Sequence, residues 1–114
     1  MNTERTIINS VNFSKRDAIN SRNGVALQDL ADGSELVVTA AAQMTVPDEE
    51  TGEIKNVSVI ITEDKECFTS ISATIYDVIG DLIDIIADEK QARIRVNQRK
   101  SKGNNRTFLT LTIL

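Results

Sequence analysis

Apolar residues occupy every second position from Leu36 to Val46, and this pattern limits the possible folds of the chain more than any other feature. Successive residues of a β-strand point to opposite faces, so the alternation predicts one long strand with a single apolar face. Such a strand needs a sheet around it and a core on one side. The apolar face would carry Leu36, Val38, Ala40, Ala42, Met44 and Val46.

Two shorter strands are predicted directly after this long strand. The segment from Pro47 to Glu53 contains one proline, one glycine and four acidic residues, a composition typical of a solvated hairpin tip. Residues 54–62 alternate again, and residues 66–69 form a short third strand after a polar turn. Because the connections are short, the three strands are expected to form an antiparallel meander. The inward side chains of the second strand would be Val57, Val59 and Ile61.

A helical period replaces the alternation after the third strand. Apolar residues at helical spacing share one face, and they are Ile71, Ile75, Val78, Ile79, Leu82, Ile85 and Ile86. The opposite face carries Asp77, Asp81, Asp84 and Asp88. The pattern predicts an amphipathic helix over about 72–88 with Ser70 or Ser72 as its N-cap. A solvated face explains the aspartates better than a metal site does.

Two further alternating runs close the chain. Residues 92–99 place Ile94 and Val96 inward, and residues 106–114 place Leu109, Leu111 and Ile113 inward. The predicted class is therefore mainly β with one helix, in the order β-β-β-α-β-β. That order is the one of an OB-fold, a five-stranded Greek-key barrel. A split β-sheet covered by one helix would have the same order of elements.

The N-terminal part of the chain precedes this predicted barrel. Residues 6–13 are expected to form an additional strand, and residues 14–24, rich in Ser, Asn, Lys and Arg, are expected to be a mobile connection. The length of 114 residues suits one domain. We therefore interpret residues 1–34 as an N-terminal strand with its connecting segment, and residues 35–114 as the barrel of a single domain.

The sequence lacks the residues that several classes of catalytic and metal-binding site require. The chain has no histidine and one cysteine, which excludes a Ser/His/Asp triad, a Cys/His dyad and a structural zinc site. The five glycines are scattered and form no phosphate-binding loop. We therefore expect no enzyme activity, no catalytic residues, no metal and no cofactor.

The hydropathy pattern and the cysteine content indicate where in the cell the protein is located. The longest nearly apolar run, residues 79–87, is interrupted by Gly80, Asp81 and Asp84, so no membrane contact is expected. Cys67 is alone and suits a reducing environment. The expectation is a soluble cytoplasmic protein, located in the host cytoplasm if a phage encodes it.

Positive charge is concentrated in the last quarter of the chain, although the chain as a whole has a net charge of −4. Seven of the 13 basic residues follow Glu89 and no acidic residue does, whereas all 17 acidic residues lie before residue 90. Such a segment is expected of a protein that binds a polyanion. The arginines of residues 92–99 alternate with the apolar positions and share one face. The candidate phosphate-binding residues are Arg93, Arg95, Arg99, Lys100, Lys102 and Arg106.

Exposed bases of a single strand also need flat apolar surfaces to stack on. Phe108 shares the polar face of the last strand with Thr110 and Thr112, so it is a candidate for stacking, and the alternative is packing under a loop. Phe68, in the short third strand, has the same two alternatives. Tyr76 is a third candidate, at the edge of the helix's apolar face, where packing with its hydroxyl in water is favoured.

Residues 30–114 resemble the single-stranded DNA-binding proteins of φ29-like phages, which replicate linear genomes by protein priming. The resemblance rests on the order and spacing of five stretches: Leu30-Ala31-Asp32-Gly33, Ala40-Ala41-Ala42-Gln43, Phe68-Thr69-Ser70-Ile71-Ser72, Asp81-Leu82-Ile83-Asp84, and Ser101-Lys102-Gly103-Asn104 before an aromatic and a Leu-x-Leu ending. Where that family tends to use tyrosines as base platforms, this chain has Phe68 and Met44.

The resemblance implies that the protein coats and protects the displaced strand during phage DNA replication, without sequence preference, and removes secondary structure from it. The expected partners are single-stranded DNA and a replication polymerase. Self-association through the N-terminal segment is a separate expectation, because the N-terminal third of the chain does not align clearly with the family and no family property is carried over to it. Two other classes of function stay open at this point. One is a protein-binding adaptor that uses the acidic faces, and the other is an assembly subunit that adds its N-terminal strand to a neighbour.

Overall fold

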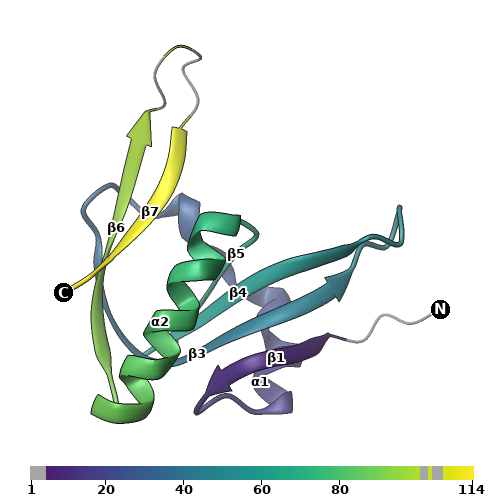
Figure 1. The fold of residues 1–114 in the computed structure, drawn as a ribbon, viewed down its shortest axis with the longest axis horizontal. Helices are drawn as coiled ribbons and strands as arrows, with labels where there is room; N and C mark the ends of the chain where they lie inside the picture. The colour runs from purple at the N-terminus through teal and green to yellow at the C-terminus, as the bar shows by residue number, and fades with distance from the viewer. Residues whose placement is uncertain (1–4, 101–102, 104–106) are drawn as a thin grey trace.

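A single curled sheet organises the computed structural model, which describes residues 5–100, 103 and 107–114 (Figure 1). Its hydrogen-bonded strand order is β2-β5-β4-β3-β6-β7, and β1 pairs with β3 outside this path. Both hairpins, β3–β4 and β6–β7, extend from the body of the molecule in different directions. The strands are β1 (Thr6–Val11), β2 (Val25–Ala26), β3 (Glu35–Pro47), β4 (Ile54–Thr62), β5 (Cys67–Ser70), β6 (Ala92–Lys100) and β7 (Thr107–Ile113).

The long strand β3 lies at the centre of the sheet. One edge of β3 pairs antiparallel with β4, while the other edge pairs first with β6 and then with β1. The antiparallel pairing of β5 with β4 completes the meander predicted from the sequence. Together, the five strands from β3 to β7 form a half-barrel that is consistent with an OB-like fold.

The expectation of one apolar face along β3 is wrong. The register of β3 against β4 shifts between Val38 and Ala40, and such an irregularity changes which face the following residues point to. Val38 and Ala41 belong to the main core, whereas Ala42 and Met44 belong to a second cluster. β4 is divided in the same way, because Ile60 packs in the main core and two of its valines pack in the second cluster, namely Val57 and Val59.

The helix α2 (Ala73–Glu89) covers the main core. The hydroxyl of Ser72 caps α2 by accepting a hydrogen bond from the N–H of Ile75, and Lys90 ends it in the left-handed conformation with φ 73°. The predicted amphipathic helix is thus confirmed, with its aspartates on the exposed face. One predicted core residue is wrong, because Ile71 precedes the helix and is 73% exposed. The buried side chains of α2 are Ile75, Ile79, Leu82, Ile83 and Ile86.

Gly80 allows α2 to approach the sheet closely. A Cβ atom at this position would lie 3.3 Å from Nε2 of Gln43 on β3, tighter than most such contacts. The same Nε2 donates a hydrogen bond of 2.7 Å to the main-chain oxygen of Tyr76. A glycine in the middle of a helix normally costs about 1 kcal/mol relative to alanine, and here it permits this link between helix and sheet.

The N-terminal segment is more ordered in structure than predicted. The additional strand is confirmed as β1, but residues 14–24, expected to be a mobile connection, contain α1 (Lys15–Asn20) and the 3₁₀ turn η1 (Ser21–Asn23). The expectation of one helix is therefore wrong. A capping box joins Ser14 and Asp17 at the start of α1, and Ala18 is buried in the second cluster. A further 3₁₀ turn, η2 (Leu27–Asp29), follows β2.

The described residues contain no helix that is both long and apolar enough to cross a membrane.

Candidate nucleic-acid interface

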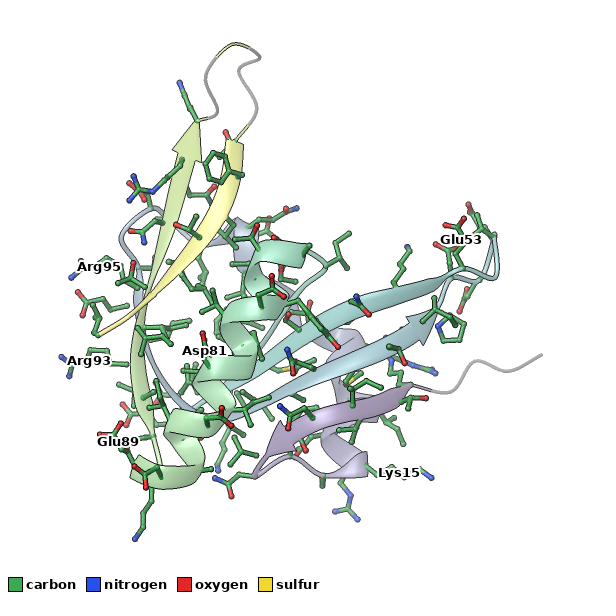
Figure 2. The ribbon with its side chains drawn as sticks, viewed as in Figure 1. Lys15, Glu53, Asp81, Glu89, Arg93 and Arg95 are labelled. Atoms are coloured by element: carbon green, nitrogen blue, oxygen red, sulfur yellow. The ribbon has the colours of Figure 1, made fainter. Side chains whose placement is uncertain are left out.

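The outward face of β6 carries the arginine row that the sequence predicts. Ala92, Ile94 and Val96 point into the core, and the alternate residues Arg93 and Arg95 are exposed. Arg99, near the end of the strand, is exposed as well. Figure 2 shows Arg93 and Arg95 projecting from β6 on the side away from α2. The guanidinium groups therefore face solvent on one side of a strand whose other side is fixed in the core.

The paired strand β7 continues this face. In the antiparallel register, Arg95 lies opposite Thr112, and Arg99 lies opposite Phe108. Residues directly opposite each other in such a pair point to the same face of the sheet. Between them, Nδ2 of Asn97 donates a hydrogen bond of 3.0 Å to the hydroxyl of Thr112. We call this surface the β6–β7 face; it consists of Arg93, Arg95, Asn97, Arg99, Phe108, Thr110 and Thr112.

Phe108 is the aromatic side chain of this face. Its side chain is exposed, with a relative accessibility of 45%, while its neighbour Leu109 is buried in the core. An exposed phenyl ring beside a guanidinium group combines a stacking surface with a phosphate partner. The prediction that Phe108 lies on the polar face of the last strand is confirmed.

The loop before β3 holds β6 in place. The side-chain amide of Gln98 donates hydrogen bonds to the main-chain oxygens of Gln28, at 2.8 Å, and Leu30, at 3.1 Å. The N–H of Gln98 donates to Oδ1 of Asp32 at 2.8 Å. Two main-chain hydrogen bonds of 2.8 Å also join Val96 to this loop, through Gly33 and Ser34. These contacts fix the part of β6 that lies beyond its pairing with β3.

One member of the arginine row has an acidic neighbour. Nη2 of Arg95 lies 3.5 Å from Oε2 of Glu35 on β3, and both side chains are nearly half exposed. Exposed ion pairs of this kind contribute about 0.2 to 1 kcal/mol at most. A phosphate group can therefore compete with Glu35 for Arg95.

Of the remaining cationic candidates, Lys100 ends β6 and is exposed. Lys102 and Arg106 lie outside the described residues. Between them, Gly103 has a φ of 98°, a conformation that favours glycine.

The other two aromatic candidates lie elsewhere. Phe68 is 4% exposed and packs in the main core, so the packing alternative holds for it and the stacking assignment is corrected. The reason is that the short strand β5 is covered on the face that carries this ring. Tyr76 is partly buried on α2, away from the arginine row. Met44, the other position at which the family resemblance suggested a base platform, is completely buried.

A groove between β5 and β7 leads away from Phe108. We call it the β5–β7 groove, and its walls include Thr69, Ser70, Ile71 and Ser72 on one side and Thr107, Phe108 and Leu109 on the other. Ile71 is 73% exposed in this groove. The sequence analysis placed Ile71 on the buried face of the helix, because its spacing matches the helical period and the helix start at Ser72 was not fixed.

The acidic hairpin tip between β3 and β4 is confirmed as a surface turn. Oδ2 of Asp48 lies 2.6 Å from Nζ of Lys55, and Oδ1 accepts hydrogen bonds from the N–H groups of Glu50 and Thr51. The hydrogen bond from Lys55, followed by those from the backbone, lowers the pKa of Asp48 to about 2. Figure 2 shows Glu53 at this tip, far from Arg93 and Arg95.

The sequence analysis missed a second group of basic residues. Arg5, Lys15 and Arg22 line a hollow between β1 and α1, together with Ile7, Ala18 and Ile19. A signal for it exists in the sequence, since residues 5–22 contain four basic residues and one acidic residue. The last quarter of the chain has more basic residues and no acidic one, so charge composition alone favours that segment over residues 5–22.

Comparison with protein families supplies an independent finding. A family model described as Phage Single-stranded DNA-binding protein, of the φ29 type, matches residues 12–114. Comparisons with curated proteins and with solved structures found no match. The family model thus matches nearly all of the chain, including β3 to β7, while Arg5 and β1 lie before the matched region.

Proposed function

The chain belongs to the family of phage single-stranded DNA-binding proteins, and on that premise we propose that it coats and protects the displaced strand during phage DNA replication. The observation that carries this proposal is the juxtaposition of exposed arginines and an exposed phenylalanine on the β6–β7 face. Guanidinium groups bind phosphates, and a phenyl ring stacks on a base.

Binding without sequence preference follows from the same groups. Phosphate contacts carry no sequence information, and every base presents a face for stacking. The cationic side chains of the β6–β7 hairpin are spread along the direction of the strand, as a track for a nucleic-acid backbone would be. By holding single strands, the protein would also remove secondary structure from them.

We further propose that β3, β4, β5, β6 and β7 are the five strands of an OB barrel. The strand order supports this, since β3 pairs with both β4 and β6, and the outer strands among these five are β5 and β7. The β5–β7 groove would then lie where the barrel is open, next to the loop between β6 and β7. In OB-folds this loop is one of those that bind oligonucleotides.

We also propose the remaining properties that the sequence predicts. The chain would act as a single domain, in the host cytoplasm, without catalytic activity, and a replication polymerase is a proposed partner. β1 supports self-association, because Ile8 is 57% exposed on this strand. Lys102 and Arg106 would add to the cationic track on the evidence of the sequence alone.

The salt dependence of binding tests the proposed function. Each phosphate contact on a single strand contributes about −0.7 to the slope of log K against log salt. The four described cations Arg93, Arg95, Arg99 and Lys100 predict a slope of roughly −3, and Lys102 and Arg106 would make it steeper. Fluorescence anisotropy with labelled oligo-dT measures this slope, with duplex DNA as competitor. Replacing Arg95 and Arg99 by Gln would make the slope shallower by about 1.4. A slope near zero, or equal competition by duplex, would contradict the proposal.

A further inference from the structure

Three hollows of the molecular surface lie next to one another, because neighbouring hollows share lining residues, and together we call them the path. The β5–β7 groove shares Thr69 and Ile71 with a second hollow between β5 and the β3–β4 hairpin. The second hollow in turn shares Arg5 and Arg22 with the hollow between β1 and α1. The path thus begins at Phe108, crosses β5 and ends at the N-terminal basic residues.

We propose that Arg5 and Arg22 form a second phosphate-binding site for single-stranded DNA, at the opposite end of this path from Arg99 and Phe108. The strand would cross β5 between two cationic ends. This inference rests on the proposed function and extends it to the N-terminal segment. Figure 2 shows Lys15 and Arg95 at opposite sides of the molecule, which agrees with two separate cationic regions.

The guanidinium group of Arg5 has few hydrogen-bond partners among the described residues. Its Nη1 donates a hydrogen bond of 3.2 Å to the hydroxyl of Ser21, but its Nε is buried and has no acceptor among the described residues. Arg22 is exposed nearby, and no carboxylate is among the described residues that line the hollow between β1 and α1. The acidic residue of this segment, Asp17, accepts a hydrogen bond from the N–H of Ser14 at the start of α1.

Electrostatics favours an anion at this position. Burial is the largest cause that lowers the pKa of Arg5, and the positive charge of Arg22 is the second. The charge interaction with Cys67 raises the pKa. Two neighbouring guanidinium groups repel each other in the free protein, and a phosphate between them would replace this repulsion by attraction. Arginine suits the role because its planar donors match the oxygens of a phosphate group.

The middle of the path, which is the second hollow, is lined by acidic as well as basic residues. Asp48, Glu49 and Glu50 line the second hollow together with Arg5 and Arg22, and Asp48 is paired with Lys55. These acids disfavour phosphates beside them and so direct the backbone toward the arginines. Ile71, exposed where the first two hollows meet, offers an apolar contact for a base or a sugar.

The adjacency of the three hollows favours single-stranded DNA as the ligand over a free phosphate ion. A free anion would need only Arg5 and Arg22, whereas the path connects them to Phe108 through hollows that a flexible strand can follow. Single OB domains bind about 4 to 16 nucleotides, so short and long oligonucleotides separate the two ends of the path.

The test compares Arg22→Gln with the matched control Arg16→Gln. Both residues are exposed and lie on or next to α1, but Arg16 lines none of the three hollows. Binding to oligo-dT from about 4 to 16 nucleotides is measured by fluorescence anisotropy. R22Q should weaken binding of the longest oligonucleotide by roughly tenfold, as expected for a charged hydrogen bond, and reduce its salt slope by about 0.7. Neither R22Q on the shortest oligonucleotide nor R16Q on any of them should differ from the wild type.

The possible outcomes separate this inference from the proposed function. If R22Q and R16Q bind the longest oligonucleotide equally well, while R95Q and R99Q weaken it, the second phosphate site is refuted and the proposed function stands. If the wild type does not bind oligo-dT at all, the proposed function fails. A nuclear magnetic resonance titration with inorganic phosphate is the other arm. A response of the Arg5 and Arg22 guanidinium signals to phosphate but not to the longest oligonucleotide would overturn the inference in favour of a free anion.

Discussion

Arg99 on β6 lies directly opposite Phe108 on β7, on the face of the hairpin that points away from the core. The two side chains therefore combine a phosphate partner with a stacking surface within one cross-strand pair. The neighbouring pairs continue the polar face with Arg95 opposite Thr112 and Asn97 opposite Thr110.

Phe108→Ala is expected to weaken oligo-dT binding without destabilising the fold. Loss of one base stack corresponds to roughly 1 to 3 kcal/mol, which is about fivefold to 150-fold in the dissociation constant. Because the ring is exposed, the urea midpoint should stay close to that of the wild type. Phe108→Tyr is the control and should retain binding, since a phenol ring also stacks. If F108L binds as tightly as F108Y, the contact is apolar packing and not stacking.

Phe68→Ala is expected to destabilise the fold without weakening oligo-dT binding. The ring is 4% exposed in the main core, and removal of such a side chain costs about 3 to 5 kcal/mol of unfolding free energy. Urea denaturation followed by circular dichroism measures the loss. Under conditions in which F68A is fully folded, its affinity for oligo-dT should match the wild type. A stable F68A variant with weakened binding would show that this ring contacts DNA after all.

Glu35→Gln is expected to strengthen oligo-dT binding by roughly two- to fivefold, because it removes the carboxylate that competes with phosphate for Arg95. Glu53→Gln is the matched control: it makes the same change of net charge at the hairpin tip, far from Arg95 (Figure 2). Anisotropy titrations at one salt concentration compare the two variants. An equal gain in both would indicate a general charge effect and no specific role for Arg95.

Asp48 is expected to titrate at a pKa of about 2, below its ordinary 3.8, chiefly because Lys55 donates a hydrogen bond to it. A carboxyl whose pKa is lowered in the folded state stabilises that state above the ordinary pKa, and the contribution is lost as pH falls from about 4 to 2. Nuclear magnetic resonance of the side-chain carboxyl carbon measures the titration. In Lys55→Gln the pKa should move back toward 3.8, and an unchanged value would assign the shift to the backbone N–H groups alone.

The sequence predicts those elements well in which one face of the strand or helix is buried and the other is solvated. β6 and β7 are of this kind, and Arg93, Arg95 and Phe108 lie on the expected face. The same reasoning fails for β3, where the register shift near Val38 divides the apolar residues between two clusters. Around the shift the residues on both faces are apolar, from Leu36 to Val38 and from Ala40 to Ala42, so the sequence does not show which of them point into which cluster.

The parts of the site that depend on tertiary contacts were not predictable from periodicity. Ile71 matches the helical period but lies before Ser72, which caps the helix, so it is exposed in the β5–β7 groove. Phe68 lies in a strand too short for its buried face to be identified from alternation. Arg5 and Arg22 approach each other only because α1 folds against β1, although the capping box at Ser14 was a signal for that helix.

The β6–β7 face is expected to bind single-stranded DNA, and this is measured by mapping amide chemical shifts during a titration with oligo-dT. The largest changes are expected at Arg95, Arg99 and Phe108, and the amides on the aspartate face of α2 around Asp81 are expected to stay unchanged. Largest changes on the aspartate face of α2 or at the hairpin tip, with the β6–β7 face unaffected, would contradict this expectation.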